Sequence, residues 1–135
     1  MSNETKPIPV IDNDSSYFWD QCSKQKLVLP YCLNCKRHHF YPRIVCPYCM
    51  SKNIEWRLSS GKGEIYTFTI ARRPPMPAFK KDVPYVIAII DLYEGPRMMS
   101  NIVNTAIDEI YCGMRVKVKF EYAKKGIYLP KIKPI

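Results

Sequence analysis

The sequence predicts a mostly β protein in three parts: a short N-terminal helix, a small metal-stabilised ribbon and a five-stranded barrel. Two Cys-x-x-Cys pairs, separated by ten residues, indicate the ribbon. A change near residue 59 from turn residues to segments rich in β-branched and aromatic residues indicates the barrel. We therefore expect residues 1–30 to hold a leader and the helix, residues 31–58 the ribbon and residues 59–135 the barrel.

Composition limits the size, location and partners of the protein. The chain has 135 residues, of which 47% are hydrophobic and 13% aromatic, enough for one packed domain plus a small appendage that needs a metal. Its 21 Lys and Arg outnumber its 12 Asp and Glu, and the net charge of +9 favours anionic partners. No apolar run reaches the ~20 residues of a membrane span, and no signal-like segment begins the chain. We expect a soluble, cytoplasmic protein without membrane contact.

Two cysteine pairs predict a structural zinc site. Its four ligands are Cys32, Cys35, Cys46 and Cys49. Zn²⁺ accepts a tetrahedral cage of four thiolates, and four cysteines leave no open position for water or substrate, which argues against a catalytic metal. Two disulfides or free cysteines are the alternatives, and the absence of a signal peptide favours the metal. His38 and His39 are expected to be loop residues outside the ligand shell.

A short helix is expected before the ribbon, from residue 16 to residue 26, with Asp14 or Ser15 as its N-cap. Phe18 and Trp19 fall on one side of this helix, and polar side chains fall elsewhere. These two aromatic side chains either pin the helix to the body of the protein or contact a partner. Both interpretations remain open at this point.

Five segments after residue 59 read as β-strands. They are residues 64–71, 85–92, 97–103, 115–121 and 127–132. Two helical turns are expected between the third and fourth strands, over residues 105–112. This number of strands and the position of the helix are those of an OB-fold barrel. The two remaining cysteines, Cys22 and Cys112, are expected to be buried as small apolar residues.

Residues 72–84 connect the first two barrel strands and combine four prolines with four cations. In an OB-fold such a connection stands at the mouth that binds ligands. The candidate ligand-binding residues are Arg72, Arg73, Phe79, Lys80 and Lys81. The alternative is an ordinary solvated loop whose charges keep the protein soluble.

The sequence offers no catalytic constellation. It has no Gly-rich phosphate loop and no Gly-x-Ser-x-Gly motif, and its two histidines both lie in the expected ribbon. No nucleophile can be paired with a general base. We therefore expect a protein that is not an enzyme, with no catalytic residues, and any catalysis would belong to a partner.

A series of motifs carries a resemblance to a known family. They follow one another as Phe18-Trp19, Cys32-x-x-Cys35, Tyr41-Pro42-Arg43, Cys46-Pro47-x-Cys49, Glu55-Trp56, Ser60-Gly61-x-Gly63, Tyr66-x-x-x-Ile70, Pro84-Tyr85-Val86 and Glu94-Gly95-x-Arg97. Over roughly residues 16–132 the chain resembles the family called domain of unknown function thirty-five. The resemblance implies an N-terminal helix, a rubredoxin-like zinc ribbon and an OB-fold. Lys36 departs from the family pattern, which often has glycine at that position.

The resemblance also implies a function in lipid metabolism. Members of this family are small accessory subunits that bind thiolase-like proteins, and their OB-fold is thought to help channel an acyl-CoA thioester. The phosphates of coenzyme A would suit the cations of residues 72–81, and Phe79 could line an acyl or pantetheine path. The alternative is a single-stranded nucleic-acid-binding protein, which the net charge and the two domain types would also serve. The apolar strand at residues 85–92 counts against that alternative.

Overall fold

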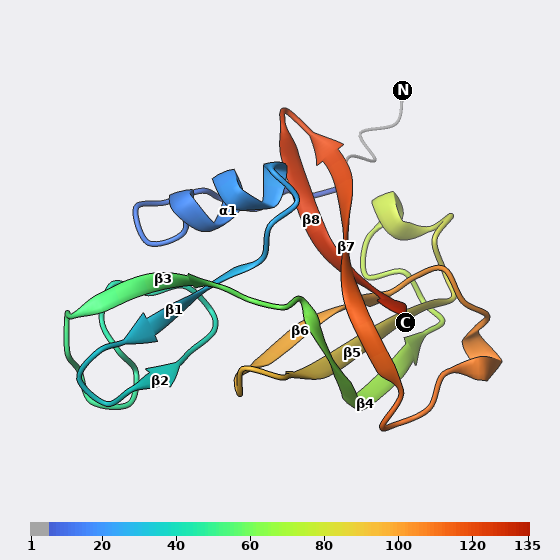
Figure 1. The fold of residues 1–135 in the computed structure, drawn as a ribbon. Helices are drawn as coiled ribbons and strands as arrows, with labels where there is room; N and C mark the ends of the chain where they lie inside the picture. Colours follow the sequence, from blue (N-terminus) through green and yellow to red (C-terminus); the bar gives the residue numbers. More distant parts are fainter. Residues whose placement is uncertain (1–5) are drawn as a thin grey trace.

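The computed structural model describes residues 6–135 and has the mostly β architecture that the sequence predicts (Figure 1). Helix α1 and the ribbon strands come first, as α1 (Ser16–Ser23), β1 (Val28–Cys32), β2 (Arg37–His38) and β3 (Ile54–Leu58). The barrel strands follow, as β4 (Lys62–Ala71), β5 (Tyr85–Leu92), β6 (Arg97–Ile102), β7 (Arg115–Lys124) and β8 (Ile127–Pro134). Two 3-10 turns complete the fold, η1 (Pro77–Phe79) and η2 (Ile107–Glu109). Within residues 6–135, no helix is long and apolar enough to cross a membrane.

The ribbon is a three-stranded antiparallel sheet in the order β2-β1-β3. Figure 1 shows this sheet beside the barrel, with α1 lying between the ribbon and the β7–β8 hairpin. The central strand β1 is almost entirely buried because ribbon strands flank its edges and α1 packs on it. The ribbon is therefore attached to the barrel through α1, which contacts both β1 and β8, and not by a linker alone.

Helix α1 is shorter than the sequence predicts, because it ends at Ser23 rather than at residue 26. Gln25 has a φ of 64°, in the left-handed region that a right-handed helix cannot continue through. Ser15 occupies the N-cap position but makes no side-chain cap, since its hydroxyl donates to the carboxylate of Asp12 at 2.7 Å. Ser15 is therefore the N-cap residue, as one of the two expectations had it, but its side chain does not cap the helix.

The barrel is closed, in the strand order β4-β5-β6-β8-β7. Most neighbouring strands pair over several residues, but β6 and β8 meet as a parallel pair at Ile102 and Ile132 alone. We call this junction the β6–β8 seam. Pro130 of β8 has no N–H to donate across it, and its carbonyl oxygen instead accepts from the hydroxyl of Ser100 at 2.6 Å. The seam thus has few backbone bonds, and the Ser100 side chain adds a contact across it.

Two expectations for the segment before β7 are wrong. Residues 105–112 contain only the short 3-10 turn η2 and not two turns of α-helix. Ala106 and Ile110, on either side of η2, have extended backbone, so the helical conformation stops after one short turn. Cys112 is exposed in this loop, whereas Cys22 is buried as expected.

Gly63 of β4 provides a test of the barrel packing. A Cβ at this position would lie 2.3 Å from the carbonyl oxygen of Asp91 and 2.9 Å from Cγ2 of Ile90. Because the first contact is with backbone, Gly63→Ala has to displace β5, and we expect the free energy of unfolding to fall by about 3 kcal/mol. Urea denaturation of the zinc-loaded protein measures this, with Lys62→Ala at the neighbouring exposed position as the control. An unchanged midpoint for Gly63→Ala would show that β4 and β5 are not in this register.

Candidate functional sites: a four-cysteine centre and a groove at the barrel seam

The four predicted cysteines converge at one end of the ribbon, with their sulfur atoms all within 4.8 Å of one another. The Sγ atoms of Cys32 and Cys49 are 3.6 Å apart, as are those of Cys35 and Cys46. A tetrahedral Zn²⁺ with bonds of ~2.3 Å requires sulfur atoms about 3.8 Å apart, so the four side chains fit zinc without rearrangement. The protein therefore has a structural zinc site.

Hydrogen bonds to sulfur hold this centre in shape. The backbone N–H of Cys35 donates to Cys32 Sγ at 3.4 Å, and the side-chain amide of Asn34 donates to Cys49 Sγ at 3.5 Å. The bond from Asn34 is the main reason that the pKa of the Cys49 thiol falls to about 6. The bond from Asn34 thus favours the thiolate of Cys49, the form that binds a metal, whereas burial raises the pKa of the Cys35 thiol, which has to lose its proton when zinc binds.

Neither histidine belongs to the group of potential metal ligands. His38 is half-buried, and its ring lies 4.8 Å from that of Tyr31. His38 is the last residue of β2 rather than a loop residue, whereas His39 lies in a loop as expected but is buried, with 1% of it exposed. Burial lowers its pKa, so His39 is neutral at pH 7. Lys36, next to the second cysteine, has a φ of 59°, which explains why glycine would suit this position.

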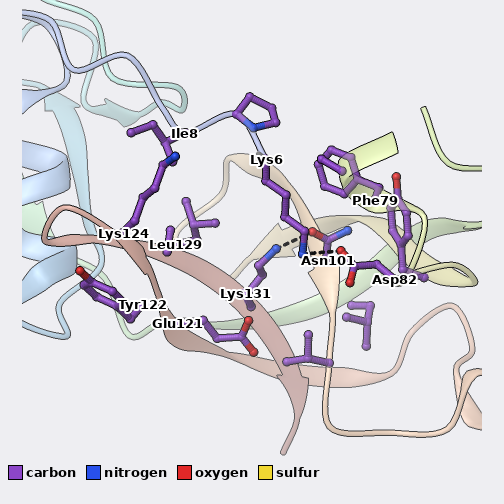
Figure 2. A pocket seen from close by; sticks show the side chains of 16 residues that line it. Lys6, Ile8, Phe79, Asp82, Asn101, Glu121, Tyr122, Lys124, Leu129 and Lys131 are labelled. Atoms are coloured by element: carbon purple, nitrogen blue, oxygen red, sulfur yellow. Dashed lines mark hydrogen bonds and ion pairs between the residues drawn. The ribbon is translucent and has the colours of Figure 1, made fainter. Parts of the chain in front are cut away.

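A groove of about 770 Å³ lies on the outside of the barrel, over the β6–β8 seam. Its floor comes from β6, β7 and β8, and its far wall comes from the end of η1 and the start of β5 (Figure 2). Residues 6–8 run across its rim. The side chains that line it are Lys6, Pro7, Ile8, Ala78, Phe79, Asp82, Tyr85, Asn101, Ile102, Val103, Glu121, Tyr122, Ala123, Lys124, Leu129 and Lys131. Ten apolar or aromatic residues, five charged ones and an asparagine thus line the groove, which offers both apolar surface and ionic groups to a small molecule.

Charges in the groove are arranged on two sides. At the rim, Lys6 forms an ion pair with Asp82, and its ammonium group lies 5.6 Å from the centre of the Phe79 ring. On the floor, Lys131 Nζ donates to Oδ1 of Asn101 at 2.7 Å. Burial lowers the pKa of Lys131. Figure 2 shows Lys131 and Asn101 pointing toward each other beneath Lys6.

Of the five candidate ligand residues in the loop at 72–84, Phe79 alone lines the groove. Arg72 and Arg73 are exposed near the end of β4, and Lys80 and Lys81 are exposed after η1. The cations that reach the groove are instead Lys6, Lys124 and Lys131, which sequence analysis did not single out. Lys124 and Lys131 lie in strands and Lys6 precedes the first helix, and neither setting gives a sign in the sequence of the cavity beside it.

Phe18 and Trp19 are buried within the chain itself. Phe18 is 0% exposed, and Trp19 is 9% exposed and donates its indole N–H to the hydroxyl of Tyr41 at 3.2 Å. These two side chains therefore pin α1 to the ribbon and leave little surface for a partner, so the structure gives no support to the expected contact. The exposed aromatic residue of this helix is Tyr17, at 45%, whose ring lies 5.2 Å from that of Trp56.

Two family models cover most of the chain. One is described as the rubredoxin-like zinc ribbon domain of ChsH2 and matches residues 19–55. The other is described as the C-terminal OB-fold domain of ChsH2 and matches residues 56–121. The boundary between them falls inside β3, close to the end of the ribbon sheet.

Curated relatives of the chain differ in length. A DUF35 domain-containing scaffold protein of Methanocaldococcus jannaschii is 40% identical over 111 residues, which cover 77% of this chain and 78% of the relative. A probable enoyl-CoA hydratase alpha subunit of Thermomonospora curvata is 33% identical over 129 residues, which cover 96% of this chain and 40% of the relative. The chain thus spans about two fifths of the length of the second relative.

A solved structure is similar over nearly the whole chain. It is a chain of the Ltp2-ChsH2(DUF35) aldolase, with a TM-score of 0.83 and 33% identity, and the match covers 94% of this chain and 98% of that one. Ribbon, barrel and their arrangement are thus shared with a protein of the same sequence family. The chain belongs to the DUF35 family of proteins, which join a rubredoxin-like zinc ribbon to an OB-fold barrel.

Proposed function

We propose that this protein is a non-catalytic accessory subunit that binds an acyl-CoA thioester, docks on a thiolase-like enzyme, and helps to hold or channel the thioester. The observation that carries the proposal is the groove over the β6–β8 seam. Its volume of about 770 Å³ is within the usual range for small-molecule sites.

The lining of the groove suits the two ends of such a ligand. Phe79, Tyr85 and Leu129 offer apolar surface to an acyl or pantetheine chain. Lys6 and Lys124 offer ammonium groups to phosphates. Two carboxylates, Asp82 and Glu121, also line the groove, and they would repel a long polyanion such as a nucleic acid. Because both signs of charge line the groove, we favour an acyl-CoA thioester over a single-stranded polynucleotide as its ligand.

The names of relatives support a partner that acts on acyl-CoA. The Thermomonospora curvata relative is named an enoyl-CoA hydratase alpha subunit, the similar solved structure is an aldolase, and the Methanocaldococcus jannaschii relative is named a scaffold protein. From these names we infer that this chain, too, assists an enzyme that acts on an acyl-CoA. We propose a thiolase-like enzyme as that partner.

Ligand binding tests the first half of the proposal. Titration calorimetry of the zinc-loaded protein with butyryl-CoA should give a saturable signal that a single-stranded oligonucleotide does not displace. Phe79→Ala removes apolar surface from the groove and should weaken binding roughly tenfold. Met76→Ala, in the same loop but outside the groove lining, is the control and should bind as the parent does. Tight oligonucleotide binding without any acyl-CoA effect would favour the nucleic-acid alternative.

Partner binding tests the second half. We propose the loop at residues 72–84 as the main contact, because its arginines and lysines are exposed and its four prolines limit the entropy lost on docking. Arg72→Glu together with Arg73→Glu should reduce the affinity for the purified thiolase-like enzyme at least tenfold, since both charges are reversed. Lys62→Glu together with Lys125→Glu, at two exposed positions outside this loop, is the charge-matched control. If co-purification survives the double change, the contact lies on another face.

A further inference from the structure

The ammonium group of Lys131 has an unusual position on the floor of the groove. It is half-buried, and the hydrogen bond that it makes within the described residues goes to Oδ1 of Asn101, at 2.7 Å. Among residues 6–135, no carboxylate lies within ion-pairing distance of it. An ammonium group has three hydrogens to donate, so Lys131 holds donors that this structure does not fully use.

The amide of Asn101 is fixed in the orientation that suits Lys131. Its Nδ2 donates to the carbonyl oxygen of Val86 on β5 at 2.9 Å, which turns Oδ1 toward the ammonium group. Lys131 lies on β8 and Asn101 on β6, and the carbonyl oxygen that orients the Asn101 amide belongs to β5. Three strands therefore fix this pair of side chains. This arrangement keeps the ammonium group at a defined point of the groove and not free in solvent.

Among the described residues, nearby carboxylates act on Lys131 only from beyond ion-pairing distance, and the positive charge of Lys6 opposes their effect. Asp82 is already in an ion pair with Lys6 on the rim, and Glu121 lines the groove without an ion pair within the described residues. Leaving a half-buried charge without a close counter-ion costs free energy, and an anion that enters the groove would recover part of it. The geometry favours an oxygen anion, because charge-assisted N–H···O bonds are the strong ones.

We propose that Lys131, held by Asn101, is an oxyanion-binding subsite on the floor of the groove that takes one carboxylate or phosphate group of the bound ligand. The inference rests on the proposed function for the idea that an acyl-CoA enters the groove, and it narrows the ligand to one that places an oxyanion at Lys131. That oxyanion comes either from the coenzyme A phosphates or from a carboxylate on the acyl chain.

The neighbouring strand supplies a matched control. Lys119 of β7 is the register partner of Lys131, and it also donates to an asparagine side chain, Oδ1 of Asn104, at 2.9 Å. That bond lies at the surface and outside the groove lining. Lys119→Met and Lys131→Met thus remove the same charge and the same kind of hydrogen bond from adjacent positions, and only the second empties the proposed subsite.

Calorimetry of the zinc-loaded full chain with three probes separates the sources of the oxyanion. Coenzyme A carries phosphates alone, succinyl-pantetheine carries a carboxylate alone, and butyryl-pantetheine carries neither. Lys131→Met should lower the affinity for the probe that supplies the oxyanion at least tenfold, as expected for a lost charge-assisted hydrogen bond. The affinity for butyryl-pantetheine should not change. Lys131→Arg should restore part of the loss, and Lys119→Met should have no effect. Equal affinities of the parent and Lys131→Met for all three probes would overturn the proposal.

A readout that does not need a thioester separates this inference from the proposed function. Binding of an oxyanion at Lys131 must raise the pKa of its ammonium group, which NMR follows through the Lys131 side-chain ε-carbon signal, assigned by its absence in Lys131→Met. If malonate or phosphate raises this pKa while no acyl-CoA binds, the subsite stands and the acyl-CoA role fails. If acyl-CoA binds but the Lys131 pKa does not rise, the subsite is wrong and the acyl-CoA role stands. Unchanged zinc content and melting temperature verify that each variant folds.

Discussion

Cys46→Ser is expected to abolish stoichiometric zinc binding and to unfold the ribbon, residues 31–58. The ribbon has short strands and few fully buried apolar side chains besides those of β1, so it cannot offset the entropy of ordering by itself. Binding of zinc to four cysteines contributes on the order of 10 kcal/mol or more in small zinc domains, and here that binding is coupled to folding. Metal analysis should fall from close to one zinc per chain to a small fraction of it.

Limited proteolysis locates the damage. We expect new cleavage sites between residues 31 and 58 in Cys46→Ser, while β4 to β8 stay protected because their barrel does not include the cysteines. Cys112→Ser is the control, since Cys112 is exposed and distant in sequence from the metal ligands. Recovery of a protease-resistant ribbon without metal would show that packing alone holds residues 31–58.

Phe18→Ala is expected to cost about 4 kcal/mol of the free energy of unfolding, the usual range for a fully buried aromatic residue. The Phe18 ring is in contact distance of three other rings, with centroids 5.0 Å from Trp19, 5.7 Å from Phe40 and 6.1 Å from Tyr41. Removing it leaves a cavity where α1 meets the ribbon. Because this cluster joins the helix to the rest of the chain, we expect α1 to detach first.

Denaturation in urea measures this cost, with tryptophan fluorescence as the probe, because Trp19 is next to the cavity. Tyr17→Ala is the matched control: it also shortens an aromatic residue of α1, but Tyr17 is 45% exposed and should cost about 1 kcal/mol. Similar midpoints for the two variants would contradict the buried position of Phe18. Both variants have to carry zinc, so that a lower free energy of unfolding is not caused by loss of the metal.

The metal centre and the strands could be predicted from the sequence because their signals are local. Four cysteines in two close pairs define the zinc ligands without knowledge of any other contact. Alternation of apolar and charged residues defines a strand such as β7 in the same way. Its end was missed by three residues, since strand ends depend on pairing, and here Tyr122 and Lys124 pair with Tyr128 and Ile127 at the start of β8.

The groove could not be predicted because it is formed by parts of the chain that are far apart. Asn101 and Lys131 are separated by 30 positions, and Lys6 reaches them only because residues 6–8 cross the outside of the barrel. For Phe18 and Trp19 the residues could be identified from the sequence, but not their role. Their apolar character is visible in the sequence, but whether the ribbon or a partner covers them depends on how α1 lies in three dimensions.

The β6–β8 seam has a consequence for the motions of the barrel. Strands β4 and β5 pair over eight residues, whereas β6 and β8 share the single pair of Ile102 and Ile132, reinforced by the bond from Val103 N–H to the Ile132 carbonyl oxygen at 2.7 Å. Local opening should therefore begin at this line, and amide hydrogens beside it should exchange with solvent sooner than those between β4 and β5. Lys131 and Asn101 lie on opposite sides of the same line. A ligand that binds both would connect the two strands. Ligand binding in the groove should therefore slow the exchange of amide hydrogens at the seam.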